Sequence, residues 1–427
     1  MKNLPGITDF CNKDFFADFR FWFEKIAILY RNLTFAFYKP DRMLEILLTA
    51  IVAFIVAFLA IPVVILIADK KKLFDMPDER KLHTHAIASL GGVGVFLGFL
   101  FAGLLCINLS QSPEIRYFYA AAVITFFIGL KDDIIALSAT KKFLAQILAA
   151  AIIVHLGGIE IQSLHGFAGV EQVPSTIGVP LTYFVIILVI NAYNLIDGID
   201  GLSGSLGLMA SLLFGTYFYL ANMYPYAAFS FSLSAALISF LIFNYHPAKI
   251  FMGDSGSLLV GMIVAVLVLK FINVASQPDA LLPIPSAVAV GISILIVPLV
   301  DTIRVFSNRI IRGRSPFSPD RNHVHHLLLD RGLTHSRVTL ICVSANIVLL
   351  LATYFTRALG NTVLILTMFG TSFTALAVLY YTLPKRKLVI HRRYIVNQAR
   401  ELERQSQSTH SRVISIQTKE SVQEQVH

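Results

Sequence analysis

Several short polar stretches interrupt this apolar chain, and their side chains are of the kinds that bind phosphate groups and metal ions. They are residues 131–133 (KDD), 191–201 (NAYNLIDGIDG), 251–257 (FMGDSGS), 321–326 (RNHVHH) and the basic stretch 75–85, which contains Lys81. They fall at alternate ends of long apolar segments, so all five are expected on one side of a membrane. Together they predict an active site at a membrane face.

Two adjacent carboxylates, Asp132 and Asp133, follow an apolar run that ends a predicted span. Successive residues of a helix diverge by about 100°, so these side chains cannot face one partner and are expected to have different roles. The plain alternative is a solvated helix end, at which the pair has no chemical role.

Polar residues follow at intervals of three along one helix face, with glycines beside the last two that permit close backbone approach. They are Asn191, Asn194, Asp197 and Asp200. Amides and carboxylates at the membrane end of a helix need partners, such as a metal ion, a lysine or the hydroxyls of a sugar. A purely structural polar cluster is the alternative.

The stretch FMGDSGS opens another predicted span. Asp254 or Ser255 could cap that helix, whose N-terminal amides favour an anion. A carboxylate followed by small residues also suits a Mg²⁺ ion that keeps some of its waters and accepts phosphate oxygens. Phe251 offers an aromatic face to a nucleobase, with an apolar anchor in the interface as the alternative.

A long basic loop carries Arg321, His323, His325 and His326. Cationic and hydrogen-bonding groups of this kind suit a pyrophosphate. A zinc site is the competing interpretation, although the loop lacks a nearby cysteine and the carboxylates elsewhere favour a hard ion. Asp301 and Arg304, one helical turn apart, are expected to form a structural ion pair.

Hydrophobic residues make up 56% of the 427 residues and charged residues only 14%, and the mean hydropathy is +0.70. Apolar runs long enough to cross a bilayer recur along the chain and predict an all-α, polytopic transmembrane bundle of about eleven spans. The alternation of a membrane barrel is missing. The predicted spans are residues 45–68, 90–109, 116–130, 141–157, 177–193, 203–221, 226–245, 256–275, 284–304, 336–356 and 361–383, with one short hairpin at 158–176.

The loops on the side of the polar stretches carry sixteen Lys and Arg residues, whereas those on the other side carry only Arg116 and Arg357. By the positive-inside rule the polar side is cytoplasmic, which places the N-terminus outside and the C-terminus in the cytoplasm. The net charge is +9 and the pI is about 9.4. The basic residues are therefore interpreted as determinants of membrane topology and as contacts for anionic lipid or phosphate, and not as a nucleic-acid-binding surface.

Three parts are expected along the chain. Residues 1–42 form a leader whose apolar run is broken by charges, and it is either an interfacial amphipathic helix or a segment before a biological start at Met43. Residues 43–383 form the transmembrane catalytic domain. Residues 384–427 form a cytoplasmic tail that is first basic and then polar and disordered.

Taken in order, KDD, NAYNLIDGIDGL, FMGDSGS and SPFSPDRNHVHH resemble the motifs of the polyprenyl-phosphate N-acetylhexosamine-1-phosphate transferases, glycosyltransferase family 4. The resemblance covers residues 45–383. The stretch SPFSPDRNHVHHLLLDRGL is most similar to the undecaprenyl-phosphate N-acetylglucosamine-1-phosphate transferases, which start O-antigen, enterobacterial common antigen or teichoic acid synthesis. The chain departs from the peptidoglycan branch, which has ten spans and a different His-rich loop.

The resemblance implies transfer of N-acetylglucosamine 1-phosphate from UDP-N-acetylglucosamine to undecaprenyl phosphate, with release of UMP, at the cytoplasmic face of the bacterial inner membrane. It implies Mg²⁺ or Mn²⁺ as the cofactor. The implied partners are a UDP-sugar donor, a polyprenyl phosphate acceptor and the bilayer, and a homodimer stays open. Direct attack of the lipid phosphate is favoured, and a two-step route through a phosphorylated Asp stays open.

Site roles follow from the same resemblance, residue by residue. Asp254, with Asp197, is expected to bind the metal, and the catalytic carboxylates are expected to be Asp132, Asp133 and Asp200. Asp132 deprotonates or orients the lipid phosphate. The residues expected to bind substrate are Lys81, Asn191, Asn194, Asp197, Asn244, Phe251, Arg321, His323, His325 and His326, with Asn244 and Phe251 facing the uracil.

Two alternatives stay open. A secondary transporter also places carboxylates within a membrane, but it predicts polar groups near mid-span and an internal repeat, and neither is evident. The same chemistry could instead use another UDP-N-acetylhexosamine or UDP-N-acetylmuramoyl-pentapeptide as the donor.

Overall fold

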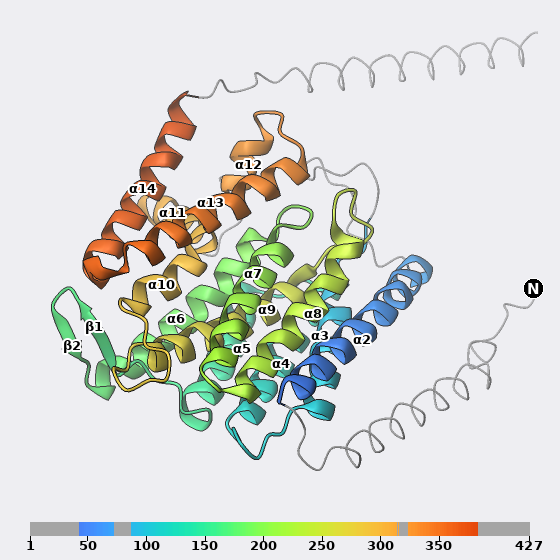
Figure 1. Cartoon of the computed structure of the whole chain (residues 1–427). Coiled ribbons are helices and arrows are strands. Elements are labelled where there is room, and N and C mark those ends of the chain that lie inside the picture. The colour runs from blue at the N-terminus through green and yellow to red at the C-terminus, as the bar shows by residue number, and fades with distance from the viewer. Residues whose placement is uncertain (1–41, 72–86, 314, 316–322, 383–427) are drawn as a thin grey trace, which may run out of the picture.

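The computed structural model describes residues 42–71, 87–313, 315 and 323–382. Its elements are shown in Figure 1. Residues 1–41 of the leader, the tail, Lys81 and Arg321 lie outside the described residues. The described helices and strands are α2 (Arg42–Lys71), α3 (Gly91–Cys106), α4 (Ile115–Ile134), α5 (Ala139–Ala151) continued by the π-helix η2 (Ile152–Leu156), β1 (Ser163–Phe167), β2 (Val170–Gln172), α6 (Ser175–Ile196), α7 (Leu202–Leu220), α8 (Tyr224–Asn244), α9 (Gly253–Ala275), α10 (Ala287–Ile294), α11 (Ile296–Ile311), α12 (Val324–Leu329), α13 (His335–Phe355), the 3₁₀ turn η3 (Arg357–Leu359) and α14 (Asn361–Thr382).

The predicted all-α membrane fold is confirmed, and each predicted span coincides with one helix or with two consecutive ones. Of the described helices, seven are long and apolar enough to cross a membrane, or eight if the bent pair α10 and α11 forms one span. The predicted count of about eleven is not confirmed, because α3 is shorter than a membrane-crossing helix and α4 and α7 are not among the helices that qualify. The chain is a multi-pass membrane protein.

Helix α9 lies at the centre of the bundle, as Figure 1 shows. Of its apolar stretch 78% is buried within the protein, against 17% for α2 and for α14. A helix that is apolar all round and enclosed by others has no lipid-facing side, whereas α2 and α14 present most of their surface outward. The first turn of α9, with FMGDSGS, is therefore held in place by several helices.

Two glycines allow helices to approach that first turn closely. A Cβ on Gly92 of α3 would lie 2.1 Å from the backbone nitrogen of Gly256, and a Cβ on Gly129 of α4 would lie 2.4 Å from the carbonyl oxygen of Asp254. Neither position tolerates a side chain in this packing. Because Gly129 lies one turn before Asp133, its contact brings the α4 carboxylates to the start of α9.

The predicted span 284–304 is not one straight helix. It breaks at Leu295 into α10 and α11, which are bent by 78°. Backbone groups freed at the break need new partners inside a membrane. The side chain of Asn346 supplies them, since its amide nitrogen donates to the carbonyls of Ser293 and Ile294 and its oxygen accepts from the N–H of Val297.

The predicted hairpin at 158–176 is confirmed as the antiparallel pair β1 and β2. Its turn is fastened to the start of α14, where the Asn361 side chain donates to the carbonyl of His165 at 2.7 Å and Thr362 accepts from the N–H of Ala168 at 2.8 Å. The hairpin therefore ties the middle of the chain to its last described helix.

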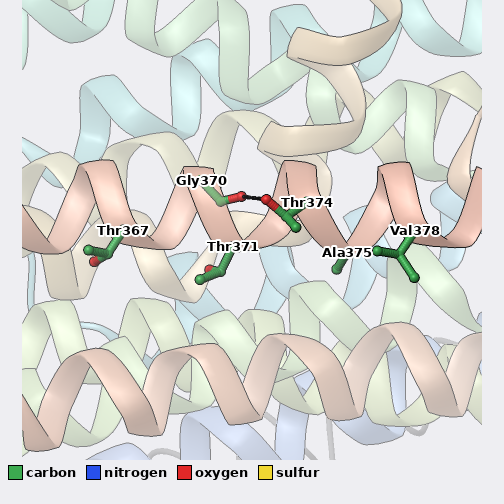
Figure 2. Close-up of a pocket in the computed structure, with 6 residues that line it drawn as sticks. All are labelled: Thr367, Gly370, Thr371, Thr374, Ala375 and Val378. Atoms are coloured by element: carbon green, nitrogen blue, oxygen red, sulfur yellow. Dashed lines mark hydrogen bonds between the residues drawn. The ribbon is translucent and has the colours of Figure 1, made fainter.

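One face of α14 carries a shallow groove, lined by Thr367, Gly370, Thr371, Thr374, Ala375 and Val378. Figure 2 shows these small side chains at successive turns of the helix, with the hydroxyl of Thr374 bonded to the carbonyl of Gly370 at 2.8 Å. None of the predicted site residues lines it. The groove thus lies outside the candidate active site.

Candidate active site

A lysine joins the two carboxylate motifs. The Nζ atom of Lys142, in the first turn of α5, lies 2.9 Å from Oδ2 of Asp132 and 2.9 Å from Oδ2 of Asp254. Two carboxylates this close repel each other unless a cation lies between them. The three side chains are 13–26% exposed, so the bridge is sheltered and still reachable. We refer to these three residues as the lysine bridge.

Lys142 was not predicted as a site residue from the sequence and was counted only as a topology determinant. Its neighbour Lys141 is exposed, so charge alone does not distinguish the two. The available signal was position, because Lys142 opens a span directly after the KDD stretch. Only the packing of α5 beside α4 and α6 shows which of the two lysines faces the carboxylates.

The other oxygen of Asp254 is also engaged. Nδ2 of Asn194 donates to Oδ1 of Asp254 at 2.8 Å and to Oγ of Ser257 at 3.0 Å. Asn194 lies in the last turn of α6, on the face predicted from the spacing of three. The structure thus brings the NAYN, KDD and FMGDSGS stretches together around one carboxylate.

Asp133 has a different partner from Asp132, as the helical geometry predicted. Its two carboxylate oxygens accept hydrogen bonds from the backbone N–H groups of Asp254 and Ser255 at 2.7 and 3.0 Å. Asp133 therefore caps α9. The expectation that Asp254 or Ser255 caps this helix was wrong, because the cap comes from a distant part of the chain. Burial raises the pKa of Asp133 to about 7.

Loss of this cap is expected to lower the stability of the protein more than its catalytic rate. We expect Asp133→Ala to lower the free energy of unfolding by about 1–3 kcal/mol, because two buried N–H groups lose their acceptor. Unfolding in detergent, followed by circular dichroism, measures this. The control is Asp69→Ala, which removes an exposed carboxylate near the end of α2. Equal stability of the two variants would contradict the capping role.

Asp197 lies directly after α6, where the helix ends. Its Oδ1 atom accepts a hydrogen bond of 2.5 Å from the hydroxyl of Ser203. Burial, together with the charges of Asp254 and Asp133, raises the pKa of Asp197 to about 7. A nearby cation would keep this carboxyl ionised at neutral pH.

The donor set fits a hard divalent cation. Asp254 and Asp197 both offer carboxylate oxygens, and the charge of Asp254 contributes to the raised pKa of Asp197. Oxygen ligands of this kind suit Mg²⁺ or Mn²⁺ better than a soft metal ion. Metal binding by Asp254 and Asp197 stays a prediction.

Two predicted substrate residues are engaged with the protein itself. Nδ2 of Asn191 donates to the side chain of Gln146 at 2.9 Å, which joins α6 to α5. Asn244 accepts from the N–H of Gly201 and donates to the carbonyl of Ile250, each at 2.8 Å. Asn191 is partly buried and Asn244 is buried, and their contact with substrate stays a prediction.

Phe251 stands in the segment that leads into α9. Its backbone is fixed by two hydrogen bonds of 2.8 Å, to Ala88 and from Gly91. Its ring is partly exposed, as a nucleobase platform requires. The uracil contact stays a prediction.

The loop that carries His323, His325 and His326, called the His loop below, is attached to α11 through Asp301. Its carboxylate accepts from the N–H of Val324 at 2.9 Å and lies 2.9 Å from Nδ1 of His323. Arg304 completes the predicted ion pair at 3.1 Å. Among the described residues the loop imidazoles do not converge as a three-ligand metal group, so the zinc interpretation gains no support there.

His325 is buried and connects the His loop to the end of α6 and the turn after it, residues 194–198 (NLIDG). A Cβ on Gly198 would lie 2.2 Å from its Nε2 atom. Burial lowers the pKa of His325 to about 3. It is therefore a neutral imidazole at physiological pH. All the described polar stretches now meet at one end of the bundle.

This contact gives a direct test of the loop's position. We expect Gly198→Ala to reduce kcat/KM at least about tenfold, because the added methyl group displaces His325 and with it the loop. Steady-state kinetics on purified protein measures the effect. Gly370→Ala is the matched control, since a Cβ there meets nothing within 4 Å. Similar kinetics for the two variants would show that the loop does not contribute.

The fold and the site define a class: a polytopic helical membrane enzyme with clustered carboxylates, a lysine and histidines at one end of the helical bundle. The model of the family "glycosyl transferase family 4" matches residues 115–272, which include the KDD, NAYNLIDGIDG and FMGDSGS stretches. The chain belongs to this family and is a transferase, as predicted.

Three of its relatives are named for a phosphotransferase activity. The chain is 34% identical over 289 residues to undecaprenyl-phosphate alpha-N-acetylglucosaminyl 1-phosphate transferase of Yersinia pestis, covering 66% of this chain and 76% of that protein. It is 34% identical over 322 residues to decaprenyl-phosphate N-acetylglucosaminephosphotransferase of Mycobacterium leprae, covering 70% and 80%. The Escherichia coli K12 enzyme of the first type is 31% identical over 290 residues, covering 66% and 76%.

Proposed function

We propose that this protein transfers N-acetylglucosamine 1-phosphate from UDP-N-acetylglucosamine to undecaprenyl phosphate or a closely similar polyprenyl phosphate, releasing UMP. The lysine bridge is the observation that carries the proposal. It joins one positive and two negative side chains at one end of the helical bundle, which is the combination of charges that a meeting point of a lipid phosphate and a nucleotide sugar requires. Two relatives that match over most of their length are named for N-acetylglucosamine phosphate transfer with undecaprenyl or decaprenyl phosphate, which supports the transferred group and the class of acceptor.

The reaction must bring two anionic phosphates to bonding distance. An oxygen of the lipid phosphate attacks the β-phosphorus of the UDP-sugar, the bond from that phosphorus to the bridging oxygen breaks, and its electron pair leaves with UMP. The bond between the sugar and its phosphate is retained. Positioning and charge compensation supply most of the catalysis in such a displacement.

The side chains divide this work. Asp132 accepts a proton from the lipid phosphate or orients it, and Lys142 is placed to release its pairing with Asp132 and Asp254 in favour of incoming phosphate oxygens. Neutral His325 and the other loop histidines bind the sugar or pyrophosphate. Asp133 holds the first turn of α9, and thus Asp254, in position.

Asp254 and Asp197 would hold the divalent cation, for which Mg²⁺ is the proposed identity. When bound, it neutralises charge on the diphosphate and on the leaving UMP. The product would be the lipid pyrophosphate-linked sugar that begins a cell-surface polysaccharide such as O-antigen. The proposed orientation places the site and the C-terminus in the cytoplasm and the N-terminus outside.

The test is UMP release by detergent-purified protein given Mg²⁺, undecaprenyl phosphate and UDP-N-acetylglucosamine, beside a blank without lipid. We expect lipid-dependent release, and slower release with UDP-N-acetylgalactosamine or UDP-N-acetylmuramoyl-pentapeptide. Faster release with one of these would assign the same chemistry to that donor. Folded protein that releases no UMP with any of the three would sink the proposal and favour a transporter.

A further inference from the structure

A second group of ligating side chains lies outside the lysine bridge, at the same end of the bundle. Asp200 in the turn before α7, His246 after α8 and His335 at the start of α13 have ligand atoms that all lie within 4.8 Å of one another. Oδ2 of Asp200 is 2.7 Å from Nδ1 of His246, and its Oδ1 is 3.1 Å from Nδ1 of His335. Among the described residues, no other set of three Asp, Glu, His or Cys side chains has ligand atoms that converge in this way.

We propose that Asp200, His246 and His335 bind a divalent transition-metal ion such as Zn²⁺, at a site separate from the Mg²⁺ carboxylates. Imidazole nitrogens suit Zn²⁺, Ni²⁺, Cu²⁺ and Co²⁺, whereas Mg²⁺ takes oxygen ligands. Metal–ligand bonds of about 2.0–2.2 Å in a tetrahedron put the ligand atoms roughly 3.3–3.6 Å apart. This separation lies between the two observed contacts to Asp200, of 2.7 and 3.1 Å, and the limit of 4.8 Å for the whole group. Two histidines and one carboxylate leave a fourth position for water.

The site is fixed before any ion binds. The carbonyl of Asp200 accepts from the hydroxyl of Thr339 at 2.8 Å, and the N–H of Gly201 donates to Asn244 at 2.8 Å. The Asp200 side chain is 1% exposed, whereas that of His246 is 42% exposed. An ion can therefore reach a buried carboxylate from the side of His246. Burial of an anion is costly unless a positive charge compensates it.

Such an ion would connect three separate chain segments. Asp200 lies three residues after Asp197, His246 lies in the loop that leads to Asp254, and His335 opens α13. A bound ion would hold these segments at fixed separations. Asp200 then acts as a positioning residue, through the loops that carry the substrate site, and not by contact with the reacting atoms.

The test is a Co²⁺ titration of the full chain, purified without a histidine tag and stripped with a chelator, with excess Mg²⁺ present. We expect one equivalent of Co²⁺ with visible d–d absorption, displaced by Zn²⁺. His246→Gln and His335→Gln are each expected to weaken binding at least about tenfold. Since His246 is largely exposed, its variant is expected to fold, and circular dichroism verifies this.

Two further variants locate the ion. Asp254→Asn and His326→Gln are expected to bind Co²⁺ as the unmodified chain does. Absence of binding, unchanged binding in both His246→Gln and His335→Gln, or loss of binding in Asp254→Asn or His326→Gln would each overturn the proposal. The titration requires no transferase activity, so its outcome is independent of the proposed function.

Discussion

Replacing Lys142 by methionine is expected to lower kcat by about a hundredfold or more, which is the effect of removing one preorganised charge from a sheltered site. The lysine lies 2.9 Å from both Asp132 and Asp254. Without it the two carboxylates repel each other and the incoming phosphates lose their cationic partner. Methionine keeps most of the side-chain length and apolar stem, so packing of the first turn of α5 is largely retained.

Lys141→Met is the matched control for this prediction. The two lysines are adjacent and carry the same charge, but Lys141 is exposed. Its variant is expected to stay within about twofold of the unmodified enzyme, since an exposed charge is screened by water and salt. UMP release at saturating donor measures both variants. Equal losses would mean that the positive charge of the loop matters and the lysine bridge does not.

Asp254→Asn is expected to have the largest effect, a loss of about a thousandfold or more in kcat, because it removes a metal-binding charge and one end of the lysine bridge. The amide can still accept from Asn194 or Lys142 but carries no negative charge. Half-maximal activity should also need more Mg²⁺. Activity measured over a Mg²⁺ series separates the two effects.

The fold around Asp254 should survive this substitution. The start of α9 is held through backbone groups by Asp133 and by the close contact with Gly92, and neither involves the Asp254 side chain. Asp279→Asn, in the exposed loop after α9, is the control and is expected to be unchanged. Retained activity in Asp254→Asn would remove this carboxylate from the proposed metal site.

The sequence by itself was sufficient for the class of fold and for the family. Apolar runs of membrane-crossing length predict helices directly, because lipid offers no partner for an open backbone. The order of KDD, NAYNLIDGIDGL and FMGDSGS predicted the family that the comparisons confirm. Helical periodicity also separated Asp132 from Asp133 and put Asn194 on the face that reaches Asp254.

Tertiary structure decided which side chains meet. Lys142 and Lys141 are equivalent in sequence, and only the packing of α5 shows which one bridges two carboxylates. The cap of α9 comes from Asp133, 121 residues before Asp254, and the bend at Leu295 depends on Asn346 from another helix. Asp200, His246 and His335 likewise lie in three distant segments. Periodicity and composition describe neighbours along one helix, whereas these contacts depend on how separate helices pack.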